Sequence, residues 1–145
     1  MPTPYAYPIK IITNDNTKTD KILYYVYPMR IMNSFHIVAE KHIEQLAKHY
    51  MIYHIDEDAF RFFSPTAVAP TILHPIMYLL EKNRPWFVRN KFYQLYGFDV
   101  CDSDRMSKTA VDMLNQLDKV AVPSQYCVKV YKESGVKTKV YHIPH

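Results

Sequence analysis

Residues 22–55 read ILYYVYPMRIMNSFHIVAEKHIEQLAKHYMIYHI, and this stretch decides the fold class. Ile22–Tyr27 is a run of β-branched and aromatic residues, which is typical of a buried strand. Asn33 or Ser34 can cap the helix that follows, in which apolar residues recur at helical spacing. Met51–Ile55 has the composition of a second strand. A strand, a helix and a strand within about 35 residues form a βαβ unit, which predicts a parallel sheet.

The alternation of strands and helices continues toward the C-terminus, and the fold class is therefore α/β, with three layers and a mostly parallel sheet. Residues 1–21 are irregular by composition, although Ile9–Thr13 could pair as an edge strand, so the domain begins at residue 22. Gly97 would cap the helix that precedes it. We expect further strands at Val68–His74, Phe98–Cys101, Lys119–Val122 and Lys139–Ile143, and further helices at Pro75–Glu81, at Trp86–Tyr96, after Ser107 and after Ser124.

Glycine is scarce, and this scarcity excludes two common classes of nucleotide-binding protein. Only Gly97 and Gly135 are present, whereas a dinucleotide-binding loop and a P-loop each need glycines close together. The chain has no apolar run of about 18 residues, which a membrane-spanning helix needs, and no signal peptide pattern. Two cysteines without metal-site spacing indicate reduced thiols, so we expect a cytoplasmic protein. The formal net charge of +4 supports an anionic partner only weakly.

Ligands of open parallel sheets bind outside the carboxyl ends of the strands, so the residues that follow each expected strand are the candidates for a site. His74 ends one strand, and its imidazole can act as a general base or donate to a sugar hydroxyl, although a lone histidine is more often structural. Ser124 would cap a helix whose exposed N–H groups attract anions. Asn33, Ser34 and His145 hold equivalent places after other strands.

Asp102 and Asp104 form an acidic pair directly after an expected strand. Two carboxylates at this spacing can hold a divalent cation that bridges a diphosphate, and the alternative is a solvated turn. Arg105 can neutralise the pair or contact a phosphate itself. The candidate catalytic residues are thus His74 and Asp102, and the candidate substrate-binding residues are Asn33, Ser34, Asp104, Arg105, Ser124 and His145.

The segment from Lys82 to Tyr93 mixes cations with aromatic residues. One interpretation is an amphipathic helix with a solvated basic face. Another is contact with an anionic membrane surface, in which case the protein would be peripheral to a membrane. We find no nucleic-acid-binding motif and expect no nucleic-acid partner. The residues that would make the membrane contact are Lys82, Arg84, Trp86, Arg89 and Lys91.

Residues 101–145 read CDSDRMSKTAVDMLNQLDKVAVPSQYCVKVYKESGVKTKVYHIPH. This stretch resembles the end of the N-terminal domain of GT-B glycosyltransferases, particularly retaining enzymes similar to family 4. Those chains typically show a helix ending in Asn-x-x-Asp, a strand closing in Val-Pro-Ser, a helix ending in Ser-Gly-Val and a strand ending in Pro-His-Gly. The matching residues, in one register, are Asn115, Asp118, Val122-Pro123-Ser124, Ser134-Gly135-Val136 and Pro144-His145.

The resemblance implies a Rossmann-like N-terminal domain, residues 22–145, that shapes the acceptor side of a cleft. There a sugar would pass from a nucleotide-sugar donor to an acceptor, with retention and with neither cofactor nor metal bound. Two departures stand out. Met29–Ser34 lacks the glycine-rich turn of the family, and we expect these 145 residues not to include the C-terminal donor-binding domain. We therefore expect the chain alone not to transfer sugar, unless a homodimer completes the cleft.

Two alternatives remain at this point. One is a stand-alone Rossmann-like binding module that has lost the chemistry. The other is a metal-dependent glycosyltransferase of the GT-A type, which uses an Asp-x-Asp motif after a strand, as Asp102-Ser103-Asp104 would supply. The Val-Pro-Ser to Pro-His stretch favours GT-B.

Overall fold

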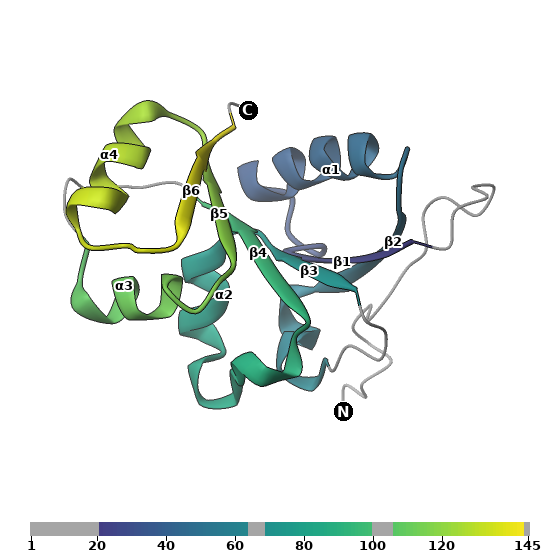
Figure 1. Ribbon diagram of the computed structural model, residues 1–145. Helices are drawn as coiled ribbons and strands as arrows, with labels where there is room; N and C mark the ends of the chain where they lie inside the picture. Colours follow the sequence, from purple (N-terminus) through teal and green to yellow (C-terminus); the bar gives the residue numbers. More distant parts are fainter. Residues whose placement is uncertain (1–20, 64–68, 100–105, 144–145) are drawn as a thin grey trace.

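The computed structural model describes residues 21–63, 69–99 and 106–143, which form a three-layer Rossmann-like α/β domain (Figure 1). Six strands make one open sheet in the order β2-β1-β3-β4-β5-β6, and every neighbouring pair is parallel. Short 3-10 helices follow β2 at Glu57–Phe62 and precede β4 at Arg84–Trp86 and Arg89–Lys91. The strands are β1 Ile22–Tyr27, β2 Met51–Asp56, β3 Pro70–Leu73, β4 Gln94–Phe98, β5 Lys119–Val122 and β6 Lys139–His142, and the helices are α1 Ser34–Leu46, α2 Ile76–Lys82, α3 Lys108–Leu114 and α4 Gln125–Glu133.

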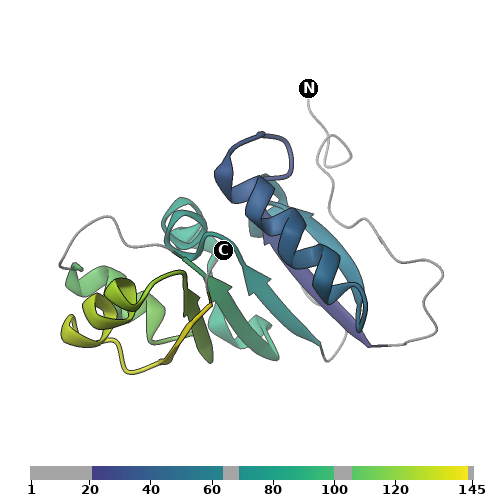
Figure 2. The ribbon, with the colours of Figure 1, turned by 90° about the horizontal axis from the view of Figure 1, so that it is seen from above.

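The strand order reverses at β1. The chain passes from β1 to β2 on one side, and then crosses to β3 on the other side before it proceeds outward to β6. Crossovers between parallel strands are right-handed, so this reversal puts α1 on one face of the sheet and α2, α3 and α4 on the opposite face. Figure 2 shows α1 running alone along β1 and β2. The reversal therefore creates a switch point between β1 and β3.

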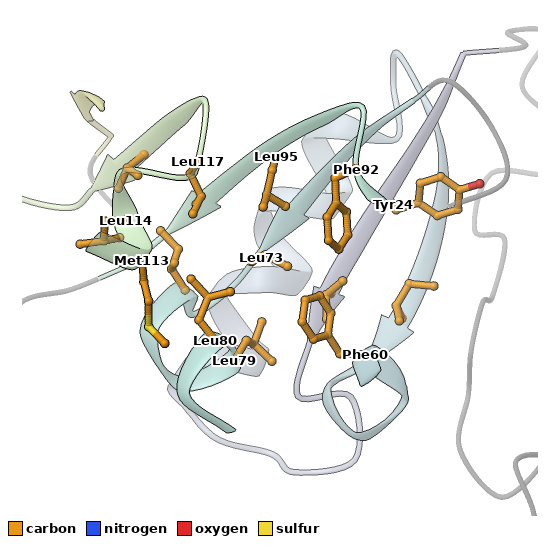
Figure 3. Close-up of a cluster of buried hydrophobic side chains, with 14 of the residues drawn as sticks. Tyr24, Phe60, Leu73, Leu79, Leu80, Phe92, Leu95, Met113, Leu114 and Leu117 are labelled. Carbon is orange, nitrogen blue, oxygen red and sulfur yellow. The ribbon is translucent and has the colours of Figure 1, made fainter. Parts of the chain in front are cut away.

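The two faces of the sheet carry separate hydrophobic cores. Residues of β1 alternate between them, so that Tyr24 and Val26 lie in the core under α2 and α3, while Leu23 and Tyr25 lie under α1. Figure 3 shows side chains of α2 and α3, among them Leu79 and Leu114, gathered against the sheet. Parallel strands are buried on both faces, which explains why β1 reads as a continuous apolar and aromatic run.

Most of the predicted elements are confirmed. The strands Ile22–Tyr27 and Lys119–Val122 have the predicted bounds. Asn33 is the N-cap of α1, and its side chain accepts a hydrogen bond from the backbone N–H of His36 at 2.9 Å. Ser107 and Ser124 cap α3 and α4 in the same way, as predicted. The edge strand considered at residues 9–13 lies outside the described residues.

The prediction of a helix at Trp86–Tyr96 is wrong. Two 3-10 turns occupy its first part, and β4 begins at Gln94. Gly97 lies within β4 rather than at a helix end, and β4 closes at Phe98 instead of starting there. The cause of the difference is a tertiary contact between β4 and α2. A Cβ atom at Gly97 would overlap Cγ1 and Cδ1 of Ile76 in α2, so the glycine marks a close approach of helix and strand.

We predict that Gly97→Ala lowers the free energy of unfolding by about 1–3 kcal/mol, since the new methyl group overpacks the contact with Ile76. Urea denaturation measures the loss. In a double-mutant cycle, Ile76→Ala should make Gly97→Ala much less costly, because it removes the overlapping atoms. Strictly additive effects of the two substitutions would contradict this explanation.

Candidate functional site

The candidate site is the carboxyl edge of the sheet at the switch point between β1 and β3, where open α/β sheets bind their ligands. Val26 and Leu73 are register partners, and the backbone N–H of His74 bonds the carbonyl of Val26 at 3.0 Å. His74 therefore leaves the sheet beside the loop at residues 28–33. That loop turns from β1 into the first residue of α1, Ser34, and exposes Arg30.

His74 is buried at this edge, with 2% of its surface exposed. The Tyr25 hydroxyl lies 2.9 Å from Nδ1 of His74 and 3.2 Å from Nδ1 of His42, a residue of α1. The two imidazole rings stack at 5.5 Å, and Phe98 packs against both. Burial, more than the nearby Tyr27, raises the pKa of Tyr25 well above its ordinary value, so its hydroxyl stays neutral. We call His42, Tyr25 and His74 the His–Tyr–His cluster.

A second group of polar side chains lies at the ends of β1 and β2. The Tyr27 hydroxyl lies 2.6 Å from Nδ1 of His54. Burial lowers the pKa of His54, and burial together with the negative charges of Glu40 and Asp56 raises the pKa of Tyr27 to about 12. Both shifts favour the neutral form, so the Tyr27 and His54 side chains are uncharged at neutral pH.

The His36 ring has a partner at each of its two nitrogens. Its Nδ1 lies 2.7 Å from the carbonyl of Pro28 and its Nε2 lies 2.8 Å from a carboxylate oxygen of Glu40. Both partners are hydrogen-bond acceptors, so a ring nitrogen of His36 that carries a hydrogen can donate to one of them. The two contacts hold the His36 ring between the loop that follows β1 and the side of α1.

Two buried carboxylates, Asp56 and Asp99, fix the loops around the switch point. Asp56 ends β2, and its two oxygens accept hydrogen bonds from the backbone N–H groups of Met29 and Asp58, each at 3.0 Å. Asp99 follows β4, and its side chain accepts from the N–H of Met77 in the first turn of α2 at 2.8 Å. Asp99 was missed because β4 was predicted too far along the chain.

The structure describes four of the eight predicted site residues, and all four follow parallel strands at this edge. Asn33 and Ser124 use their side-chain oxygens as N-caps, Ser34 is exposed at the start of α1, and His74 is buried. Their roles in catalysis or substrate binding stay predictions. The other four, Asp102, Asp104, Arg105 and His145, lie outside the described residues.

The N-termini of α1 and α4 open on the same edge. Each is capped by a neutral side chain, Asn33 or Ser124, and neither helix has an acidic residue in its first turn. By contrast, the side chain of Asp99 accepts from the first turn of α2. The N-terminus of a helix carries partial positive charge and free N–H groups, so the ends of α1 and α4 favour an anion.

The residues behind the GT-B resemblance have structural roles. The Asn115 side chain accepts from the N–H of Lys137 at 2.6 Å, and the Asp118 side chain accepts from the N–H of Leu95 at 2.8 Å. Gly135, at φ 103°, ends α4, where its N–H bonds Lys132 and the next N–H bonds Tyr131. This is a Schellman motif, which needs glycine at that position.

Two cations of the predicted membrane-contact segment are engaged within the domain. Lys82 pairs with Asp58 at 2.6 Å and with Glu57 at 3.2 Å. The Arg89 guanidinium binds Asp118 at 2.7 Å and also donates to two backbone carbonyls. Within the described ranges no helix is long and apolar enough to cross a membrane. Nor do three His, Cys, Asp or Glu side chains in these ranges gather closely enough to hold a metal.

Comparison with known proteins identifies one similar sequence of interest. The uncharacterized protein 356 of Sulfolobus islandicus rod-shaped virus 1 is 30% identical over 132 residues. The match covers 86% of this chain but 37% of the viral protein. The chain thus spans little more than a third of the length of the relative that it matches. No family model and no solved structure matches the chain.

We predict that His54 makes the domain less stable in mild acid. The pKa of His54 is lowered in the folded state, so below its unfolded pKa, about 6.5, the unfolded chain binds a proton that the folded chain resists. Urea midpoints should fall between pH 7.5 and pH 5.5, and less steeply in His54→Asn. The exposed His49 is the control, and His49→Asn should leave the slope unchanged. Equal slopes in all three proteins would contradict the prediction.

Proposed function

We propose that this chain is the acceptor-side domain of a retaining GT-B glycosyltransferase, forming one wall of a cleft in which sugar passes from a nucleotide-sugar donor to an acceptor. The observation that carries the proposal is the reversal of strand order at β1. It brings the loop after β1, His74 and the N-terminus of α1 to one point of the carboxyl edge. Open α/β sheets bind nucleotide-containing ligands at such a point.

The C-terminal third supports the proposal through its local structure. Val122-Pro123-Ser124 is a strand end followed by an N-cap, and Ser134-Gly135-Val136 is a helix end of the Schellman type. These features account physically for the residues that resemble the GT-B family. They define a strand–helix–strand scaffold. In this proposal the groups that contact substrates lie on the loops at the carboxyl edge.

The electrostatics of the edge suit a phosphorylated donor. The N-terminus of α1 and the exposed Arg30 lie at the switch point, and the N-terminus of α4 lies farther along the same edge, so positively charged groups are available to a phosphate there. A diphosphate leaving group develops negative charge as the glycosidic bond breaks, and preorganised N–H donors stabilise such charge. In this proposal the protein needs no resident metal ion, as in the GT-B family that it resembles.

A second candidate function is a stand-alone binding module without catalysis. The burial of His74 favours it, because a side chain with 2% exposure offers little surface to a substrate. A transfer assay with a panel of nucleotide sugars separates the two functions. The viral relative, which contains more than this domain, should transfer sugar with retention if the proposal holds. Turnover by the 145 residues alone would indicate a cleft completed in another way, such as by a homodimer.

We predict that a negative charge at the N-terminus of α1 weakens nucleotide diphosphate binding about tenfold. Asn33→Asp keeps an oxygen that can cap the helix and adds a charge that repels phosphate. Binding to one wall of a cleft should be weak, on the order of millimolar, so NMR titration with UDP, GDP and ADP is the measurement.

Two matched controls accompany this substitution. Asn33→Ser keeps a cap without charge, and Gln45→Glu adds the same charge at the exposed far end of α1. Both should bind within twofold of the original protein. If Asn33→Asp and Gln45→Glu change the affinity equally, the N-terminus of α1 is not part of the site.

A further inference from the structure

We infer that one side of the sheet at β4, β5 and β6 binds single-stranded nucleic acid, whose bases stack on tyrosine rings while lysines contact its phosphates. The surface consists of Tyr96 in β4, Lys119 in β5, and Lys139 and Tyr141 in β6, and we call it the tyrosine–lysine face. It lies on the flat of the sheet rather than at the carboxyl edge, so the inference goes beyond the proposed function and does not rest on it.

The topology leaves this part of the sheet open on one side. α1 lies along β1 and β2, and β4 and β5 lie beside it rather than beneath it (Figure 2). On this side α1 reaches as far as Phe98 of β4, whose ring lies 4.2 Å from that of His42. Residues of α2, α3 and α4 pack into the core on the opposite side, and in the described ranges no further helix follows β6. Parallel sheets are ordinarily covered on both faces, so the open side calls for a partner.

The side chains of these strands differ between the two sides of the sheet. Leu95 and Val120 are aliphatic and lie in the core under the helices. On the open side Tyr96 is half-buried at the border of the core under α1, and Lys119 and Lys139 are exposed. An apolar partner would bury both ammonium groups, which is costly without a negative charge to pair them. The open side therefore suits an anionic partner that also offers flat apolar groups.

Contacts between rings and cations show that the four side chains share one side of the sheet. The Lys119 ammonium lies 5.8 Å from the ring centroid of Tyr96 and 5.9 Å from that of Tyr141. The Lys139 ammonium lies 5.3 Å from the Tyr141 centroid. Lys119 and Lys139 are register partners, so two cations stand on neighbouring strands. Their charges repel each other, and a phosphate placed above them would offset that repulsion.

The arrangement matches the two kinds of group in a nucleic-acid strand. Contacts between a cation and a ring are weak at an exposed surface, and the lysine stem is flexible, so each ammonium can turn from a ring to a phosphate. The tyrosine rings are then open to base stacking, which tolerates any sequence because every base has a π-face. Sheets that carry aromatic side chains bind single-stranded RNA by such stacking.

Asp118 is an acidic residue beside this face, and it is paired within the domain. Its carboxylate binds the Arg89 guanidinium at 2.7 Å. Burial, and after it Asp118 and neighbouring tyrosines, raise the pKa of Tyr96, so that this ring is uncharged at neutral pH. The tyrosines are Tyr50, Tyr93 and Tyr141. The face thus presents neutral rings and cations to its ligand.

No local sequence motif marks the tyrosine–lysine face, because its four residues come from three strands. The expectation that the chain has no nucleic-acid partner rested on the lack of such a motif. Only the parallel pairing of β4, β5 and β6 brings these residues together. The formal net charge of +4 agrees with an anionic ligand.

The test measures binding of a labelled oligothymidylate of about 12 nucleotides to the 145-residue chain by fluorescence anisotropy at low salt. We expect a Kd on the order of 10 μM. A duplex of the same length and an abasic strand with the same phosphates should each bind at least tenfold more weakly, because neither offers open base faces. Oligouridylate should bind within about fivefold of oligothymidylate, since the contacts are to bases and phosphates.

Substitutions on the face separate stacking from charge. Tyr141→Ala removes a ring from the edge strand and should weaken binding about tenfold, as should Tyr96→Ala. Lys119→Gln removes one phosphate contact, so the slope of log K against log salt should become shallower by about 0.7. Tyr141→Ala and Lys119→Gln carry the test if Tyr96→Ala does not fold.

Matched controls lie on α4, which packs on the other side of the sheet. Tyr126→Ala removes an exposed ring and Lys129→Gln removes an exposed cation. Both proteins should bind oligothymidylate within twofold of the original, with the same salt dependence.

Three results would overturn the inference. One is no binding of oligothymidylate at low salt, and another is equal affinity for the abasic strand, which would leave charge alone as the cause. The third is a dimer in light scattering that Tyr141→Ala dissociates, because the face would then belong to a second copy of the chain. None of these results involves sugar transfer or the carboxyl edge, so failure of this inference and failure of the proposed function are distinguishable.

Discussion

The placement of β1 between β2 and β3, parallel to both, is the constraint on which the rest of the structure depends. All six β1 residues pair with β2, and three pair with β3. Right-handed crossovers on either side of β1 then force α1 onto one face and the remaining helices onto the other. The same pairing sets three β1 tyrosines inside the domain, Tyr24, Tyr25 and Tyr27, each almost wholly buried. Both hydrophobic cores and both buried histidine–tyrosine contacts follow from this one strand.

The local sequence was sufficient to predict those segments whose conformation does not depend on distant parts of the chain. The strand Ile22–Tyr27 and the caps at Asn33 and Ser124 were predictable, because an apolar run and a capping side chain act within a few residues. The conformation of residues 84–98 was not predictable, because it depends on α2. Trp86–Tyr96 has a helical pattern, but β4 forms there instead, since Gly97 lets this strand approach Ile76 closely. No local pattern in the sequence predicts that contact.

The candidate site was likewise predictable only in part. The edge of the sheet and the residues that follow its strands were predictable from the strand pattern and the rule for parallel sheets. The burial of His74 was not, because its partners Tyr25 and His42 come from distant parts of the chain. The residues that resemble GT-B enzymes are scaffold residues, which explains why they identify a fold more readily than a reaction. What the domain does must be decided at the loops and helix ends of the carboxyl edge.

Mapping where a nucleotide sugar contacts the domain tests the central claim most directly. Amide chemical shifts of the ¹⁵N-labelled chain, followed through titrations with a panel of nucleotide sugars, report that location residue by residue. The account predicts that the perturbed amides cluster at the carboxyl edge, in the loop at 28–34, after β3 at 74–77 and at the start of α4 at 124–127. Perturbations confined to the opposite edge of the sheet, or none with any donor at saturating concentration, would contradict it.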